Sequence, residues 1–125
     1  IFDGTLEKFP SLKILASHGG GYLPSYAGRI DHAWGARPDC SGNDLKHPPT
    51  YYLKKMHFDT IVFTYEQLKY LVDVFGADKI VMGTDYPYDM AEDDPVGHVL
   101  GTPGLNQDDI KKITGINAAK LLGVN

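Results

Sequence analysis

A histidine followed by three glycines, His18 to Gly21, comes directly after an apolar run at residues 12–17. The imidazole of histidine titrates near neutral pH, so His18 could bind a metal, position a metal-bound water or act as a general acid or base. Glycines permit positive φ angles and close approach to the backbone. The alternative is a histidine that is hydrogen-bonded within a strand-end turn. The apolar run and the glycines together favour a functional role.

A second apolar run, at residues 80–83, leads to Asp85 and then to Pro87. The Asp85 carboxylate could bind a divalent metal or accept a proton. The alternative is an Asx turn, in which the aspartate caps the chain before the proline. Burial of a carboxylate costs free energy unless a cation or hydrogen-bond donors compensate it. A position beside His18 at the same edge of a sheet therefore favours the functional interpretation.

Two further residues carry groups that could serve the same site. Arg29 lies eleven residues after His18, and its planar guanidinium suits a substrate carboxylate. An exposed arginine on a helix surface is the alternative, and sequence alone favours it. Asp59 stands near the end of a third apolar segment and is a second-rank candidate.

The other histidines and the acidic run are interpreted structurally. His57 stands inside a predicted strand and is expected to be packed, with its hydrogen bonds satisfied. His47 and His98 fall in predicted loops and receive no role. The acidic residues at 92–94 lack the ligand spacing of a calcium loop, so a solvated loop is expected there.

Hydrophobic periodicity predicts the elements that would position these residues. The predicted strands are residues 13–17, 56–61 and 79–83. The predicted helices are residues 1–9, 24–34, 64–75, 106–114 and 116–122. Residues 51–55 are predicted to form a helical turn, and residues 35–50, rich in glycine and proline, a loop.

Helix-end signals support this division. Thr64 with Gln67 forms a capping-box pattern, Gly76 follows as a stop, and Asn106 is placed to cap a later helix. Alternation of helix and strand predicts a parallel sheet with right-handed crossovers. Catalytic groups in such sheets gather at the carboxyl ends of the strands, which is where His18 and Asp85 stand.

The composition is that of an ordinary globular protein. The chain has 125 residues, 42% of them hydrophobic, and a net charge of −4, so residues 1–125 suit one domain or part of one. No apolar stretch approaches the roughly 20 residues of a membrane helix, and no signal-peptide pattern is present. Lysine and arginine form no cluster, which argues against a nucleic-acid partner.

Cysteine usage and the first residue add two expectations. The single Cys40 excludes an internal disulfide and a cysteine-based zinc site, and a cytoplasmic location is the default. Ile1 stands where an initiator methionine would be, so the chain is expected to begin partway through a gene product.

Three segments resemble the decarboxylases of the amidohydrolase superfamily. They are LKILASHGGG (residues 12–21) with Pro24 and Arg29, DKIVMGTDYP (residues 78–87) and GINAAKLLG (residues 115–123). The resemblance implies a distorted (β/α)8 barrel with one catalytic metal, usually zinc. It implies that residues 1–125 form the carboxyl-terminal part of that barrel, about three β/α units holding strands six to eight.

The same resemblance implies roles for three residues. His18 matches the histidine that positions and activates the metal-bound water. Asp85 matches the aspartate that ligates the metal. Arg29 matches the arginine that reaches into the neighbouring subunit to hold a substrate carboxylate, so a homodimer is implied. A metal lowers the pKa of bound water and acts as a Lewis acid, which accords with these roles.

The chain departs from the family pattern in its metal ligands. It contains no His-x-His pair, and a full barrel needs about 200 residues or more. We therefore expect an incomplete ligand set and no activity of this chain alone. The leading hypothesis is a metal-dependent decarboxylase of small carboxylated aromatic or muconate-like acids. The alternatives are a hydrolase or hydratase on the same scaffold, and a catalytically inactive fragment.

Overall fold

Three short parallel strands form the centre of the computed structural model, which describes residues 1–41 and 45–124. The strands are β1 (Leu15–Ala16), β2 (His57–Asp59) and β3 (Ile80–Val81), with β2 in the middle. Ala16 pairs with Phe58, and Phe58 pairs with Ile80. The predicted parallel sheet is confirmed, although each strand is shorter than its apolar run.

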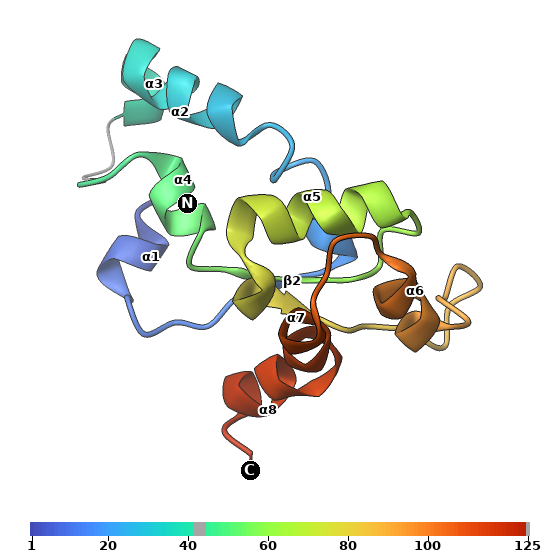
Figure 1. Ribbon diagram of the computed structural model, residues 1–125. Coiled ribbons are helices and arrows are strands. Elements are labelled where there is room, and N and C mark those ends of the chain that lie inside the picture. Colours follow the sequence, from blue (N-terminus) through green and yellow to red (C-terminus); the bar gives the residue numbers. More distant parts are fainter. Residues whose placement is uncertain (42–44, 125) are drawn as a thin grey trace.

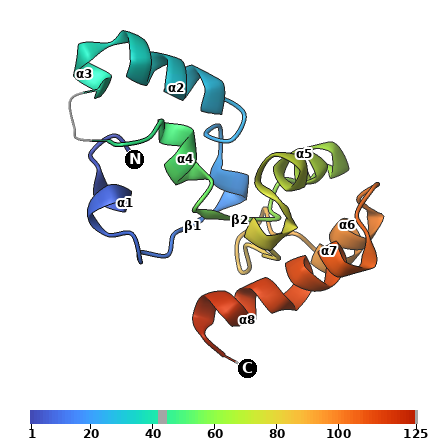
Figure 2. The ribbon, with the colours of Figure 1, turned by 60° about the vertical axis from the view of Figure 1, so that its left-hand side comes forward.

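The helices lie on both sides of these strands (Figure 1). The helices before β2 are α1 (Thr5–Lys8), α2 (Ala27–Ala36), α3 (Pro38–Ser41) and α4 (Pro49–Leu53). The helices after it are α5 (Tyr65–Phe75), α6 (Pro95–Gly101), α7 (Gln107–Lys111) and α8 (Asn117–Leu122). Short turns of other helical types are η1 (His18–Gly20), η2 (Ala77–Lys79) and the π-helical η3 (Lys112–Ile116). Figure 2 shows α1 to α4 on one side of the strands and α5 to α8 on the other.

The predicted helix ends are confirmed where a specific side chain or glycine defines them. Thr64 Oγ1 accepts a hydrogen bond from the Gln67 amide at 3.2 Å and begins α5, and Gly76 ends it with φ 88°. Asn106 caps α7 in a reciprocal capping box. Gly123 ends α8 in the left-handed conformation.

Two stretches differ from the prediction. The expected loop at residues 35–50 contains α3 and the start of α4, and residues 42–44 of it lie outside the described residues. The region after the acidic run contains α6, because Asp94 accepts a hydrogen bond from the Gly97 amide at 2.8 Å and Pro95 takes the first helical position.

The start of α2 also differs from the prediction. This helix begins at Ala27 and not at Pro24, whose carbonyl accepts a hydrogen bond from Tyr70 Oη at 2.9 Å. Pro24 therefore serves in a buried turn between η1 and α2. None of the helices in the described part of the chain is long and apolar enough to span a membrane.

The hydrophobic core lies between the sheet and α5. Phe58 and Ile80, neighbours in register, are fully buried, as are Leu68 and Leu71 of α5. Ile113 joins the same core from η3. Burial of apolar surface stabilises a fold by about 25 cal/mol per Å2. The buried cluster therefore stabilises the position of β2, the middle strand of the sheet.

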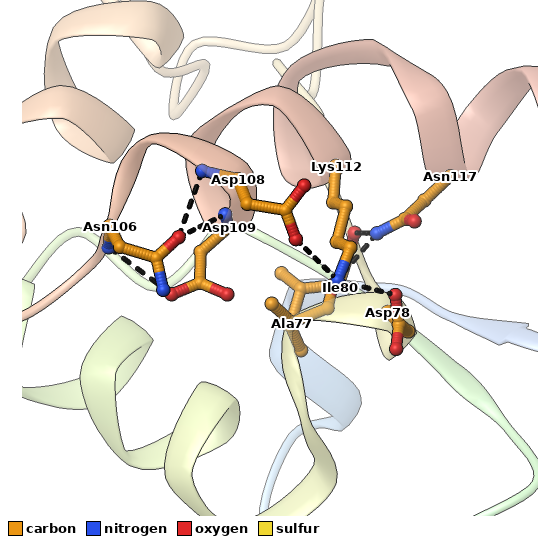
Figure 3. A network of polar contacts seen from close by, with 8 residues as sticks. All are labelled: Ala77, Asp78, Ile80, Asn106, Asp108, Asp109, Lys112 and Asn117. Carbon is orange, nitrogen blue, oxygen red and sulfur yellow. Dashed lines mark hydrogen bonds and ion pairs between the residues drawn. The ribbon is translucent and has the colours of Figure 1, made fainter.

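The carboxyl-terminal helices are tied to the entry of β3 (Figure 3). Asn117 is buried, and its Nδ2 donates to the carbonyls of Ala77 and Ile80, both at 2.7 Å. Lys112 Nζ contacts Asp78 at 3.3 Å and Asp108 at 2.7 Å. These contacts fix the amino end of β3 and leave its carboxyl end, which leads to Asp85, facing the candidate site.

Candidate functional site

The chain leaves β1 through a left-handed turn at His18. Four consecutive residues, His18 to Gly21, have positive φ angles of 56°, 59°, 78° and 60°. Glycine adopts this region freely, whereas a histidine there costs of order 1–3 kcal/mol. Such strain persists only where surrounding contacts impose it, and it clusters at functional sites.

Close packing also requires the glycines. A Cβ on Gly19 would lie 2.4 Å from Val62 Cγ1, and a Cβ on Gly20 would lie 2.7 Å from the Phe58 ring. A Cβ on Gly21 would meet no heavy atom of the other described residues within 4 Å, its chain neighbours apart, so only its backbone conformation calls for glycine. The predicted close approach to the backbone is confirmed, and the neighbours are side chains of the chain itself.

Asp85 reaches the same edge of the sheet from β3. It also has a positive φ, 61°, and its carboxylate Oδ1 lies 3.5 Å from His18 Nε2. The Asp85 side chain is 22% exposed and that of His18 is 63% exposed. The side chain that caps the backbone here is Thr84, not Asp85: Thr84 Oγ1 accepts a hydrogen bond from the Tyr86 amide at 3.2 Å. The Asp85 carboxylate is thereby left to face His18.

A hollow of about 200 Å3 lies at this pair. It is lined by His18, Ile61, Phe63, Asp85 and Met90. Two titratable side chains therefore share an open, largely apolar recess at the carboxyl edge of the sheet. This arrangement can hold a small ligand while a proton passes to or from the imidazole.

Arg29 stands elsewhere on the surface. It lies on the exposed part of α2 and lines two other hollows, one with Tyr22, Tyr26 and Cys40, the other with His32 and Arg37. The structure thus brings His18 and Asp85 together, whereas the Arg29 side chain of the same chain lines other hollows.

Asp59, the second-rank candidate, is directly hydrogen-bonded to the backbone of His18. It ends β2, is 8% exposed, and accepts a hydrogen bond from the His18 amide at 2.9 Å. The sequence carries one signal for this role, a charged residue at the end of an otherwise apolar strand. A buried charge is seldom tolerated unless other groups pair with it.

Two histidines differ from the predictions made for them. His57 is half-buried as expected, but its Nδ1 has no hydrogen-bond partner among residues 1–41 and 45–124. Burial, with a smaller contribution from Lys79, lowers the pKa of His57 below its ordinary value. His98 is not in a loop: it is buried in α6 with its ring stacked on Tyr65, 5.6 Å between centroids.

The donor types at the pair fit one side of a metal site. Carboxylate oxygen and imidazole nitrogen are ligands that divalent ions such as zinc and manganese accept. Catalytic zinc sites use three protein ligands. In the described part of the chain, no group of three or more His, Cys, Asp or Glu side chains is placed to hold a metal ion.

Comparison with known proteins identifies the family of the chain. The family model for amidohydrolases matches residues 1–124. The chain belongs to the amidohydrolase family. A relative, 2-amino-3-carboxymuconate-6-semialdehyde decarboxylase of Dictyostelium discoideum, is 37% identical over 125 residues, which is 100% of this chain and 33% of the relative.

Solved structures of decarboxylases share the fold of this amidohydrolase chain. That of 5-carboxyvanillate decarboxylase from Sphingomonas paucimobilis matches with a TM-score of 0.88 and 27% identity, over 99% of this chain and 37% of that chain. That of dihydroxybenzoic acid decarboxylase from Polaromonas sp. JS666, with bound manganese and the inhibitor 2-nitroresorcinol, matches with a TM-score of 0.82 and 28% identity, over 97% and 36%.

The chain spans about one third of the length of the curated relatives that it matches. The predicted relationship to amidohydrolase decarboxylases is confirmed, and the α/β fold matches theirs. The assignment of β1, β2 and β3 to barrel strands six, seven and eight stays a prediction.

Proposed function

We propose that this chain supplies the strand-six-to-eight side of the active site of a metal-dependent decarboxylase. The substrate class is small carboxylated aromatic or muconate-like acids. The observation that carries the proposal is the 3.5 Å approach of His18 Nε2 to Asp85 Oδ1 at the carboxyl edge of the parallel sheet. The relatives and neighbours named above are decarboxylases, which favours decarboxylation over hydrolysis or hydration on this scaffold.

His18 is the proton-transfer residue in this proposal. When the carbon–carbon bond to the carboxylate breaks, carbon dioxide leaves and the electron pair stays on the ring or chain carbon. That carbon then takes a proton, which the exposed His18 imidazole is placed to deliver. Asp85 lies beside it, with its Oδ1 3.5 Å from His18 Nε2.

Asp85 is the proposed metal ligand. A bound divalent ion would act as a Lewis acid on the substrate. Zinc was the expectation from the resemblance, and manganese occupies the solved Polaromonas structure. We propose a divalent ion without preference between the two. Because the described residues offer fewer than three suitable ligands, we expect this chain alone to bind either ion weakly and to be inactive.

Calorimetric titration of the 125-residue chain with Zn2+ and with Mn2+ tests the metal assignment. We expect weak binding that Asp85→Asn weakens further. A stoichiometric, submicromolar site that needs Asp85 would contradict the expected incompleteness of the ligand set. Binding that is unchanged in Asp85→Asn would contradict the role of Asp85 as a ligand.

Carbon dioxide release by the complete gene product that contains this sequence tests the reaction. His18→Gln should lower kcat by roughly 100-fold or more, the usual contribution of a general acid. His47→Gln is the matched control, because His47 is exposed, its ring contacts Tyr51 of α4, and it does not line the hollow at the pair. Equal activity of the two variants would refute the assignment of His18.

Arg29 is proposed to hold the substrate carboxylate of a neighbouring subunit in a homodimer. Its position away from the His18–Asp85 hollow of its own chain supports this assignment. The test mixes inactive Arg29→Gln and His18→Gln proteins. If each site takes its arginine from the other subunit, random exchange restores about one quarter of the unmutated activity. Absence of any restoration after exchange would contradict action across the subunit boundary.

A further inference from the structure

The buried carboxylate of Asp59 accepts three backbone hydrogen bonds. Asp59 Oδ2 accepts from the His18 amide at 2.9 Å. Asp59 Oδ1 accepts from the Gly19 amide at 2.8 Å and from the Ile61 amide at 3.1 Å. Two of these donors are 40 and 41 residues away along the chain, so the contacts join the end of β2 to the turn after β1.

These contacts account for a charged group in the core. A buried carboxylate is tolerated when several donors satisfy it, and hydrogen bonds to an ionised acceptor are about twice as strong as neutral ones. With both oxygens engaged by backbone amides, the Asp59 side chain is turned to the main chain and away from the role of a third metal ligand. Its effect must therefore pass through the residues that it holds.

The residue that it holds is strained. His18 adopts φ 56°, which a histidine reaches only when its surroundings impose it. The two amides that Asp59 accepts are those of His18 and Gly19, the first two residues of the left-handed turn. The carboxylate thus stabilises the conformation in which the imidazole faces Asp85.

The residue that follows β2 holds the segment that leads to Asp85. Thr60 is fully buried, and its Oγ1 accepts a hydrogen bond from the Gly83 amide at 3.2 Å. Gly83 lies two residues before Asp85, and a Cβ on it would come within 3.3 Å of Asp59 Cβ. The end of the central strand and the residue after it therefore contact both of the segments that carry the candidate residues.

We propose that Asp59 is a positioning residue that sets the backbone of His18, and that Thr60 does the same for the segment leading to Asp85. Neither side chain touches the reacting atoms in this proposal. The inference rests on the proposed function only for what His18 does, since the geometry that Asp59 imposes is a property of the fold.

Nuclear magnetic resonance of the full 125-residue chain tests this proposal without substrate. Asp59→Asn keeps the size of the side chain but presents an amide group to the backbone donors. We expect hydrogen exchange at the His18, Gly19 and Ile61 amides to accelerate at least about tenfold, as loss of hydrogen bonds to a charged acceptor implies. The nuclear Overhauser contact between the His18 ring and the Asp85 β-protons should disappear.

Two further variants separate positioning from stability. Thr60→Val keeps the shape of the side chain and should accelerate exchange at the Gly83 amide while the His18 and Gly19 amides keep their rates. Asn106→Ala is the matched control: it removes an acceptor of two backbone amides, at 2.8 and 2.9 Å, in the cap of α7. It should leave the contact between His18 and Asp85 intact.

Either of two results would overturn the proposal. In the first, Asp59→Asn leaves the hydrogen-exchange rates of the His18 and Gly19 amides and the contact between the His18 ring and Asp85 unchanged. That result would show that the turn keeps its conformation without the Asp59 carboxylate. In the second, hydrogen exchange accelerates uniformly at all amides, those of α7 included. That result would show that Asp59 contributes only to the overall stability of the fold. Both readouts are independent of catalysis, so an inactive complete protein would refute the proposed function and leave this inference standing.

Discussion

Substitution of Gly19 by alanine tests whether the histidine turn has the packing described above. Gly19 has φ 59° and ψ 18°, and a left-handed conformation costs an L-residue roughly 1–2 kcal/mol. The added Cβ would also lie 2.4 Å from Val62 Cγ1 and 3.2 Å from Leu71 Cδ1. Overpacking of this kind costs about 1–3 kcal/mol. Together these effects predict a loss of about 2–5 kcal/mol in the free energy of unfolding, a large share of the about 5–15 kcal/mol of a typical domain.

Gly123→Ala is the matched control for the backbone part of this loss. Gly123 has φ 71° and ψ 30°, close to Gly19, but a Cβ on it would meet no heavy atom within 4 Å among the described residues, its chain neighbours apart. The difference between the two variants therefore isolates the contacts of the new Cβ with Val62 and Leu71. Urea denaturation followed by circular dichroism measures both losses.

A double substitution makes this prediction sharper. Val62→Ala removes the methyl group that the new Cβ would overlap, so the Gly19→Ala, Val62→Ala double variant should be more stable than the sum of the single losses predicts. The expected coupling is at least about 1 kcal/mol. Equal losses for Gly19→Ala and Gly123→Ala, or strict additivity in the double variant, would refute the packing argument.

Two other predictions concern the support of β3 and the amino end of β2. Asn117→Ala should lower the free energy of unfolding by about 2–4 kcal/mol, because two buried carbonyls lose their donor. The control Asn106→Ala should lower it by about 1 kcal/mol, through loss of a helix cap. Equal losses in the two variants would contradict the anchoring of α8. Burial and then Lys79 lower the pKa of His57 in the fold, so the unfolded chain binds this proton more readily. Stability should therefore fall as the pH decreases below the ordinary value of about 6.5, and His57→Gln should flatten that part of the profile in urea denaturation; an unchanged slope would exclude His57 as the cause.

The edge of the sheet at which the site forms was predictable from the sequence. Two apolar runs, each ending in a chemically capable residue, are enough to place His18 and Asp85 together once the strands are parallel. The helix ends at Thr64 and Gly76 were predictable for a similar reason, since one side chain or one glycine defines each of them. Local signals sufficed where the determining contact is local.

What the sequence did not reveal depends on contacts between distant segments. Asp59 reads as an ordinary strand-end acid until its partners, 40 residues earlier, are in place. Pro24 reads as a helix start until Tyr70 Oη donates to its carbonyl. The helix at α6 was missed although Asp94 and Pro95 carry its cap, because the acidic run before it resembles a solvated loop.

Contacts between distant segments of this chain shape the candidate pair, and this bears on how the site is built. Asp59, the last residue of β2, contacts the His18 turn, and Thr60, the residue after it, contacts the segment before Asp85. Phe58 of β2 is fully buried in the same core as Leu68 and Leu71 of α5. The positive φ angles of His18 and Asp85 are thus supported from the end of the central strand and the residue after it. In the proposed metal site, further ligands would therefore meet a pair whose geometry is already set, which reduces the entropy cost of assembling the site.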